Sequence, residues 1–198
     1  MSHVISGFDG SILHTINGAA TGDNFGLPVG KVGDVNNDGF ADFLGAARSC
    51  DLGGFNAGCV YVHSGKTGTE LHRFDGEGIQ SVFGTGVTSA GDFNGDGHAD
   101  ILASGQYDKI NGNASGTVRI FSGNGGSGLL TIRGEEGEEL GADLDMVGDV
   151  NDDGTSDILI SRITDGGHVY IYSGANGEVL ETFDRENAFD NFGESIAY

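Results

Sequence analysis

The sequence has few basic residues. Lys and Arg total 9 of 198 residues against 30 Asp and Glu, which gives a formal net charge of −21. Nucleic acids and anionic membrane surfaces attract basic patches, so the composition argues against both as partners and favours cations, or a saline environment. An apolar run of about 18 residues, the minimum for a membrane-spanning helix, is also missing, so no membrane insertion is expected.

Proline is nearly absent, and glycine is abundant. One Pro and 38 Gly in 198 residues predict many tight turns and few long helices. The first residues, "MSHVISGFDG", lack the basic end and apolar run of a signal peptide. Either a signal has been removed or none was present.

Three acidic stretches reveal a repeat: "GDVNNDGFAD", "GDFNGDGHAD" and "GDVNDDGTSD". Asp92 follows Asp34 by 58 residues, and Asp149 follows Asp92 by 57. Nine residues before each of these aspartates stands an aromatic or aliphatic residue followed by Gly, and a fourth such pair lies near the end of the chain. The pairs are Phe25-Gly26, Phe83-Gly84, Leu140-Gly141 and Phe192-Gly193.

Each unit reads as four short strands. An apolar run follows each acidic loop ("DFLGAA", "DILASG", "DILISR"), then an alternating strand ("CVYVHSG", "TVRIFSG", "HVYIYSG") and a last strand ("ELHRFDG", "GLLTIRG", "EVLETFD"). Period-two alternation favours strands, and a repeated four-stranded unit of this length predicts the blades of a β-propeller. A parallel β-helix is the competing all-β fold, but its coils are shorter.

The prediction is therefore one all-β propeller segment with three full blades and two part-blades. "HVISG" and "SILHTING" match the third and fourth strands of a preceding blade, and "FGESIAY" matches the first strand of a following one. The expected boundaries are a part-blade over 1–24, blades over 25–82, 83–139 and 140–191, and a part-blade over 192–198.

The acidic stretches predict calcium sites. Oxygen-bearing side chains at positions 1, 3, 5 and 9, a Gly at position 6 and a backbone carbonyl at position 7 suit a hard divalent cation. An EF-hand is excluded, because its Glu at position 12 is replaced by Gly45, Ala103 or Ile160 between strand-like flanks. Asx turns without metal are the alternative. The predicted ligands are Asp34, Asn36, Asp38, Phe40 (carbonyl) and Asp42; Asp92, Asn94, Asp96, His98 (carbonyl) and Asp100; and Asp149, Asn151, Asp153, Thr155 (carbonyl) and Asp157. The ion is expected to be structural, because no base or nucleophile accompanies these residues at fixed spacing.

The combination of Phe25-Gly26, the acidic loops and "LGAA" (residues 44–47) resembles the FG-GAP repeat of the integrin alpha-subunit β-propeller and its bacterial relatives. The resemblance covers nearly the whole chain, although "LASG" and "LISR" replace the later GAP motifs. It implies a seven-bladed propeller, calcium in the hairpin between strands one and two of a blade, and an adhesive, extracellular role. Fold alone does not fix function.

Cys50 and Cys59 lie near the two ends of one loop, where integrin-like propellers can carry a disulfide. Two reduced thiols are the alternative, since a bridge across a small loop gives a modest entropic gain. This loop and "GQYDKINGNASG" carry Phe55, Tyr107, Arg48 and Lys109, which either serve recognition or cap the blade beneath.

The expected function is a calcium-stabilised extracellular module for adhesion or for binding a protein ligand, without catalysis. No Gly-x-Ser-x-Gly elbow, phosphate loop or paired His ligands appear in the sequence. A glycan-binding propeller and the non-catalytic scaffold of a polysaccharide-degrading enzyme are the alternatives. A homo-oligomer that completes the propeller is a further possibility, with a truncated piece of a larger propeller as its rival.

Overall fold

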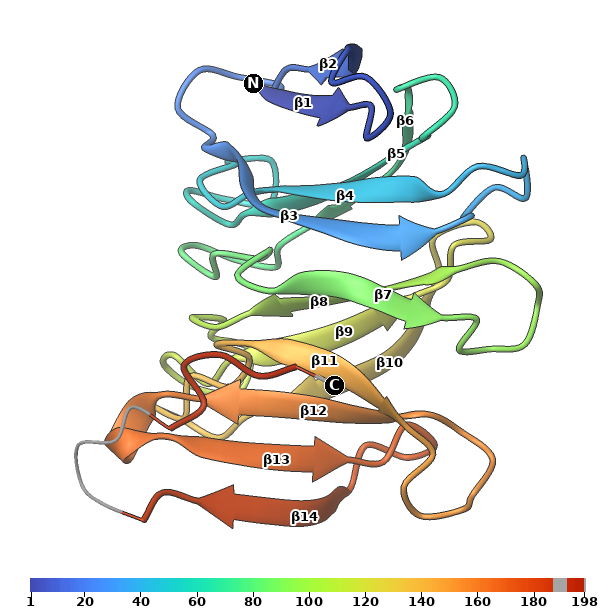
Figure 1. Cartoon of the computed structure of the whole chain (residues 1–198). Helices are drawn as coiled ribbons and strands as arrows, with labels where there is room; N and C mark the ends of the chain where they lie inside the picture. The colour runs from blue at the N-terminus through green and yellow to red at the C-terminus, as the bar shows by residue number, and fades with distance from the viewer. Residues whose placement is uncertain (187–191, 198) are drawn as a thin grey trace.

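The structure is a stack of antiparallel sheets (Figure 1). It is a computed structural model that describes residues 1–186 and 192–197. The described residues form fourteen β-strands and one 3-10 turn, η1 (Thr164–Gly166). No helix among them has the length and apolar character needed to span a membrane. The predicted all-β fold of four-stranded blades is confirmed.

A two-stranded hairpin comes first and three four-stranded blades follow it. The hairpin consists of β1 (Ser2–Ile5) and β2 (Ile12–Ile16). Blade 1 consists of β3 (Phe25–Gly33), β4 (Asp42–Ala47), β5 (Cys59–His63) and β6 (Glu70–Asp75). Blade 2 consists of β7 (Val87–Gly91), β8 (Asp100–Gly105), β9 (Thr117–Phe121) and β10 (Gly128–Arg133). Blade 3 consists of β11 (Leu144–Gly148), β12 (Asp157–Arg162), β13 (His168–Tyr172) and β14 (Val179–Asp184). In each blade the strands pair in chain order.

The hydrophobic core lies between the blades. Leu44, Val60 and Val62 of blade 1 form one buried cluster with Phe83 and Ile101 from the blade 2 segment. A second cluster joins blades 2 and 3 in the same way. Since the faces of neighbouring sheets are buried against each other, the second and third strands of blades 1 and 2 are almost continuously buried.

Each FG glycine lets two blades approach closely. A β-carbon on Gly84 would lie 2.7 Å from Cβ of Ala46 in the preceding blade, and one on Gly193 would lie 3.0 Å from Cβ of Ser161. Both glycines have positive φ, 93° and 81°. Gly84, Gly141 and Gly193 therefore each lie against a small residue in the second strand of the preceding blade, whereas Gly26 lies against Ser2 of the N-terminal hairpin.

The strand predicted at the C-terminal end is not found. Residues 192–197 form turns and bends, although Gly193 packs on blade 3 as the other FG glycines pack on their neighbours. An inner strand forms by pairing with the second strand of its own blade, and none of the described residues after Phe192 forms such a partner. The predicted boundaries at residues 187–191 and at residue 198 fall outside the described residues.

The outer face of blade 3 is exposed. Phe183 pairs with Val169 as Phe74 pairs with Val60 and as Ile132 pairs with Val118. Phe74 and Ile132 are 7% and 5% exposed, but Phe183 is 42% exposed. The difference arises because no described residues form a further blade over this face.

Candidate metal loops and loop cavity

The three acidic loops are hairpins that join the first and second strands of each blade, as predicted. They project from the same end of the blades (Figure 1). Each hairpin closes on the pairing of a glycine with the position-9 aspartate: Gly33 with Asp42, Gly91 with Asp100, and Gly148 with Asp157. A register shift precedes each of these glycines, which have φ of 96°, 68° and 72°. The bulge turns the chain out of the sheet and into the loop.

Positions 1, 3 and 5 of the first loop gather around its own backbone amides. The Asp38 N–H lies 3.1 Å from Oδ1 of Asp34 and also 3.1 Å from Oδ1 of Asn36. The Gly39 N–H donates to the second oxygen of Asp34 at 2.8 Å. Oδ1 of Asp38 accepts the Phe40 N–H at 3.1 Å. The Asp38 N–H therefore holds two side-chain oxygens close together, although these two oxygens, both partially or fully negative, repel each other.

The second and third loops repeat this arrangement. Asp92 and Asn94 both accept the Asp96 N–H at 2.9 Å. Asp149 and Asn151 accept the Asp153 N–H at 3.0 Å and 3.1 Å. The position-7 residues His98 and Thr155 donate their N–H groups to the position-5 carboxylates at 3.0 Å and 2.9 Å. One geometry therefore serves all three sequences.

Position 4 also has a fixed conformation that sequence reasoning missed. Asn37, Gly95 and Asp152 all have left-handed φ, at 57°, 74° and 60°. Glycine, asparagine and aspartate are the residues that adopt this conformation at least cost. Their occurrence at this one position in all three repeats was the available signal.

The position-9 aspartates have a structural role of their own. Asp157 is fully buried, and its Oδ2 accepts the Val150 N–H at 2.8 Å while its Oδ1 accepts the Gly174 N–H at 3.0 Å. Asp42 binds the amides of Val35 and Gly65 in the same way. Each carboxylate therefore joins the acidic hairpin to the turn that follows the third strand. The Ser-Gly pair in "HSG", "FSG" and "YSG" was the sequence signal for this link.

Asp100 forms the equivalent link in blade 2. Its oxygens accept the N–H groups of Phe93, Asn94 and Gly123 at 2.9 Å, 3.2 Å and 2.9 Å. Burial raises the pKa of this carboxyl, and the three N–H donors oppose that shift. In the exposed third loop, the Asn151 side chain and then the Thr155 N–H lower the pKa of Asp153.

Histidines connect neighbouring repeats. Nδ1 of His98 donates to the Val35 carbonyl at 2.7 Å, and its Nε2 lies 3.3 Å from the Asn37 amide, so the second acidic loop contacts the first. His14 and His72 donate to the carbonyls of Gly65 and Gly123 in the following blade, at 2.9 Å and 2.7 Å.

The structure does not by itself establish a metal site. Within residues 1–186 and 192–197, no group of three or more His, Cys, Asp or Glu side chains is placed to hold a metal ion. The donor set nevertheless fits calcium, because every side-chain ligand is a carboxylate or amide oxygen, and each carboxylate oxygen has more than one acceptor site. Calcium at the predicted ligands therefore stays a prediction.

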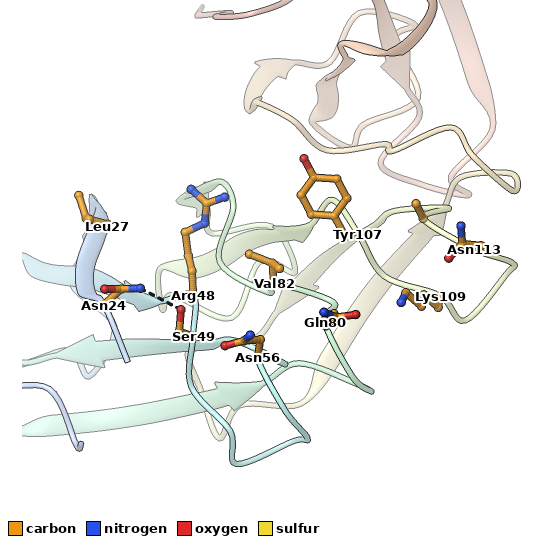
Figure 2. A pocket seen from close by; sticks show the side chains of 11 residues that line it. Asn24, Leu27, Arg48, Ser49, Asn56, Gln80, Val82, Tyr107, Lys109 and Asn113 are labelled. Carbon is orange, nitrogen blue, oxygen red and sulfur yellow. Dashed lines mark hydrogen bonds between the residues drawn. The ribbon is translucent and has the colours of Figure 1, made fainter. Parts of the chain in front are cut away.

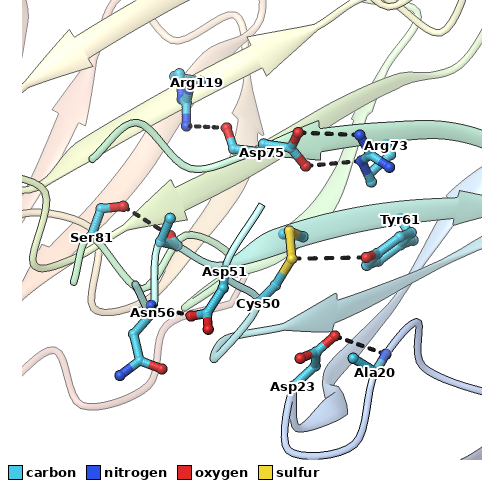
Figure 3. Close-up of a disulfide and its surroundings, with 12 residues drawn as sticks. Ala20, Asp23, Cys50, Asp51, Asn56, Tyr61, Arg73, Asp75, Ser81 and Arg119 are labelled. Atoms are coloured by element: carbon cyan, nitrogen blue, oxygen red, sulfur yellow. Dashed lines mark hydrogen bonds and ion pairs between the residues drawn. A yellow bond between two sulfur atoms is a disulfide. The ribbon is translucent and has the colours of Figure 1, made fainter. Parts of the chain in front are cut away.

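Cys50 and Cys59 form a disulfide across the β4–β5 loop, with 5.6 Å between their α-carbons (Figure 3). Both residues are buried, and Sγ of Cys50 lies 3.9 Å from the Tyr61 hydroxyl. In the same loop, Asp51 accepts the Asn56 N–H at 2.7 Å. Of the two alternatives for these cysteines, the structure has the disulfide.

The β4–β5 and β8–β9 loops border a cavity of about 670 Å³ at the other end of the blades from the acidic hairpins (Figures 1 and 2). We call it the loop cavity. Three of the four residues suggested for recognition, Arg48, Tyr107 and Lys109, line it. Phe55 does not line it and is 60% exposed. The structure thus brings together residues from two repeats.

Comparison with known proteins gives a consistent result. A family model described as an FG-GAP-like repeat matches residues 34–103. The chain is 36% identical over 187 residues to integrin alpha-6 of Gallus gallus, which covers 87% of this chain and 17% of that protein. It is 37% identical over 162 residues to integrin alpha-6 of Homo sapiens, covering 77% and 14%. With integrin alpha-V of Gallus gallus the identity is 28% over 156 residues, covering 72% and 15%. The chain spans about one sixth of the length of these curated relatives.

Solved structures with a similar fold include two rhamnogalacturonan lyases. YesW superposes with a TM-score of 0.50 at 15% identity, over 98% of this chain and 38% of that one. The Bacillus licheniformis enzyme superposes with a TM-score of 0.52 at 18% identity, over 88% and 37%. At these identities the likeness shows the fold alone.

Proposed function

Because the chain belongs to the FG-GAP repeat proteins, with repeats of the integrin alpha-subunit type, we propose that it is a ligand-binding module of an extracellular or cell-surface adhesion protein. Its acidic hairpins bind calcium as structural ions. The observation that carries this proposal is the equivalent hydrogen bonding of the position 1, 3 and 5 oxygens in three successive loops. A metal-free Asx turn needs no such repetition of three acidic or amide groups.

Two further observations support this proposal, one on the compartment and one on the use of the acidic loops. The Cys50–Cys59 disulfide suits an oxidising compartment. The position-1 aspartates Asp34, Asp92 and Asp149 accept backbone N–H groups of their own hairpins, which supports a structural use of these loops. A homo-oligomer that completes the propeller stays a prediction, and the exposed Val179 and Phe183 mark the face it would cover.

The calcium role is tested by thermal unfolding in calcium and in chelator. An ion that binds only the folded state adds about 2.7 kcal/mol at a hundredfold excess over its Kd. For a domain of this size that corresponds to a rise in melting temperature of about 5–10 °C. An unchanged melting temperature would contradict structural calcium.

The third loop offers a matched pair of variants. Asp153→Asn removes a predicted ligand charge but keeps an oxygen for the Thr155 N–H, and Asp152→Asn removes a neighbouring charge at a position not predicted to bind metal. We expect Asp153→Asn to reduce the calcium-dependent shift and Asp152→Asn to leave it unchanged. Equal effects would mean that calcium only screens the acidic surface.

The ligand-binding role is tested separately, by probing an array of immobilised proteins and glycans with the folded chain in calcium. Saturable, calcium-dependent binding to at least one class is expected. A chain that is folded but binds neither class would contradict the proposed role.

A further inference from the structure

The loop cavity has an unusual charge for this protein. Among 198 residues with 30 Asp and Glu and 9 Lys and Arg, none of the eleven residues that line the cavity is acidic. Two of them, Arg48 and Lys109, are basic. Arg48 comes from the β4–β5 loop of blade 1, and Lys109 comes from the β8–β9 loop of blade 2 (Figure 2).

Neither cation has an acidic partner among the described residues. Arg73, Arg119 and Arg162 form salt bridges at 2.9 Å, 3.0 Å and 4.0 Å. Arg48 and Lys109 form none with any other residue in 1–186 or 192–197. An unpaired guanidinium and an unpaired ammonium therefore place two positive charges on the lining of one cavity in a strongly negative molecule.

The acidic residues nearest to the cavity in the sequence accept backbone N–H groups and do not line the cavity. Asp23 accepts the Ala20 N–H at 3.0 Å, and Asp51 accepts the Asn56 N–H at 2.7 Å. Asp108 is buried and accepts the Ile110 N–H at 3.0 Å. These carboxylates order the loops and do not line the cavity. The acidic hairpins lie at the opposite end of the blades (Figure 1).

The rest of the lining suits a ligand with many hydroxyl groups. The side-chain amides of Asn56, Gln80 and Asn113 line the cavity, and no hydrogen bond ties them to the other described residues. Each amide has two donor hydrogens and an acceptor oxygen, which matches hydroxyl groups that both donate and accept. Tyr107 adds an aromatic face with a polar end (Figure 2).

The lining is less suited to a peptide. Peptides add a strand to a free sheet edge or place apolar anchors in a groove. Leu27, on the edge strand β3, is the one lining residue that lies in a strand, and the residue after it, Pro28, has no N–H to donate to an added strand. The apolar lining consists of Leu27, Val82 and Ala114. The volume of about 670 Å³ lies within the range of about 300–1,000 Å³ usual for ligand clefts.

We propose that the loop cavity binds an oligosaccharide that carries carboxylate groups. Arg48 and Lys109 bind the carboxylates, the amides of Asn56 and Gln80 bind hydroxyls, and Tyr107 packs against a sugar ring. This inference rests on the ligand-binding role proposed above, and it names the site and the ligand class.

The test is calorimetric titration of the whole chain, at constant calcium concentration, with three probes. They are a short oligomer of uronic acid, the same oligomer with its carboxyl groups reduced to alcohols, and a glutamate-rich peptide of equal charge. We expect the uronic acid oligomer to bind at least tenfold more tightly than either other probe, and its affinity to fall as salt is added.

Three variants locate the site. Arg48→Gln and Lys109→Gln each remove one cation from the cavity and are expected to weaken uronate binding by about tenfold, because a charged hydrogen bond is lost. Lys31→Gln, an exposed charge on β3 that does not line the cavity, is the control and should bind as the unaltered chain does. Unchanged melting temperatures establish that the variants are folded.

Equal binding of the reduced oligomer would overturn the carboxylate requirement, and tighter binding of the peptide would overturn the ligand class. An equal loss of uronate affinity in Lys31→Gln would mean that net charge, not the cavity, drives binding. If the chain binds proteins on the array but none of the oligosaccharides, this inference fails and the ligand-binding role stands. If it binds nothing at all, both fail.

Discussion

Gly141 of the third blade segment lies directly against Ser104 of blade 2. A β-carbon on Gly141 would be 2.7 Å from Cβ of Ser104, and the residue has φ of 92°. Gly84 stands in the same relation to Ala46, also at 2.7 Å. The contact shows why "LASG" and "LISR" allow the same packing between repeats as "LGAA". The third residue of each segment has a small side chain that lies against the glycine of the next repeat.

Gly141→Ala is expected to lower the free energy of unfolding by about 2–4 kcal/mol. The β-carbon would strain the left-handed backbone and force the two blades apart. Gly125→Ala is the control, because Gly125 has nearly the same φ, 90°, and no other group lies within 4 Å of the place that its β-carbon would occupy. Urea unfolding measures both, and equal losses would mean that backbone strain alone explains the glycine.

Asp157→Asn is expected to destabilise the chain by about 1–3 kcal/mol in chelator, where calcium plays no part. The new amide nitrogen would face one of the two buried N–H groups that the carboxylate now accepts, those of Val150 and Gly174. Asp152→Asn, an exposed change in the same loop, should stay within about 0.5 kcal/mol. A neutral result for Asp157→Asn would assign this residue to metal binding only.

His63 is expected to make stability depend on pH. It is 6% exposed, its ring stacks on Phe43 at 5.5 Å, and burial lowers its pKa below 6.5. The unfolded chain therefore takes up a proton that the folded chain resists, so stability falls as pH drops through 6.5 towards the folded pKa. His63→Phe should reduce this loss between pH 7.5 and 5.5, measured by urea midpoints, whereas the exposed His3→Gln should not. A slope unchanged in His63→Phe would contradict the assignment.

Replacing both Cys50 and Cys59 by Ala is expected to cost about 2–3 kcal/mol, because the bridge no longer restricts the unfolded chain. The β4–β5 loop should also become more accessible to protease, since the bridge no longer holds its two ends together. Limited proteolysis and urea unfolding check the two effects. A variant as stable as the unaltered chain would show that the loop is ordered without the bridge.

The sequence predicted the repeat well because its signals are local. Alternating apolar residues, glycine turns and the spacing of Asp34, Asp92 and Asp149 identified four-stranded blades and placed the acidic loops in hairpins. It did not predict that residues 192–197 would lack a strand, because strand formation depends on a partner and not on the segment's own pattern.

By itself the sequence determined the all-β fold, the order of strands and the set of acidic and amide side chains in each loop. Only the tertiary structure decided which groups these side chains bind. Asp42, Asp100 and Asp157 accept N–H groups of a turn distant in sequence, and His98 donates to a carbonyl of the preceding loop. The structure also decided that Arg48 and Lys109, 61 residues apart in the chain, border one cavity. Contacts between blades join residues far apart in sequence, and no local pattern encodes the distance between them.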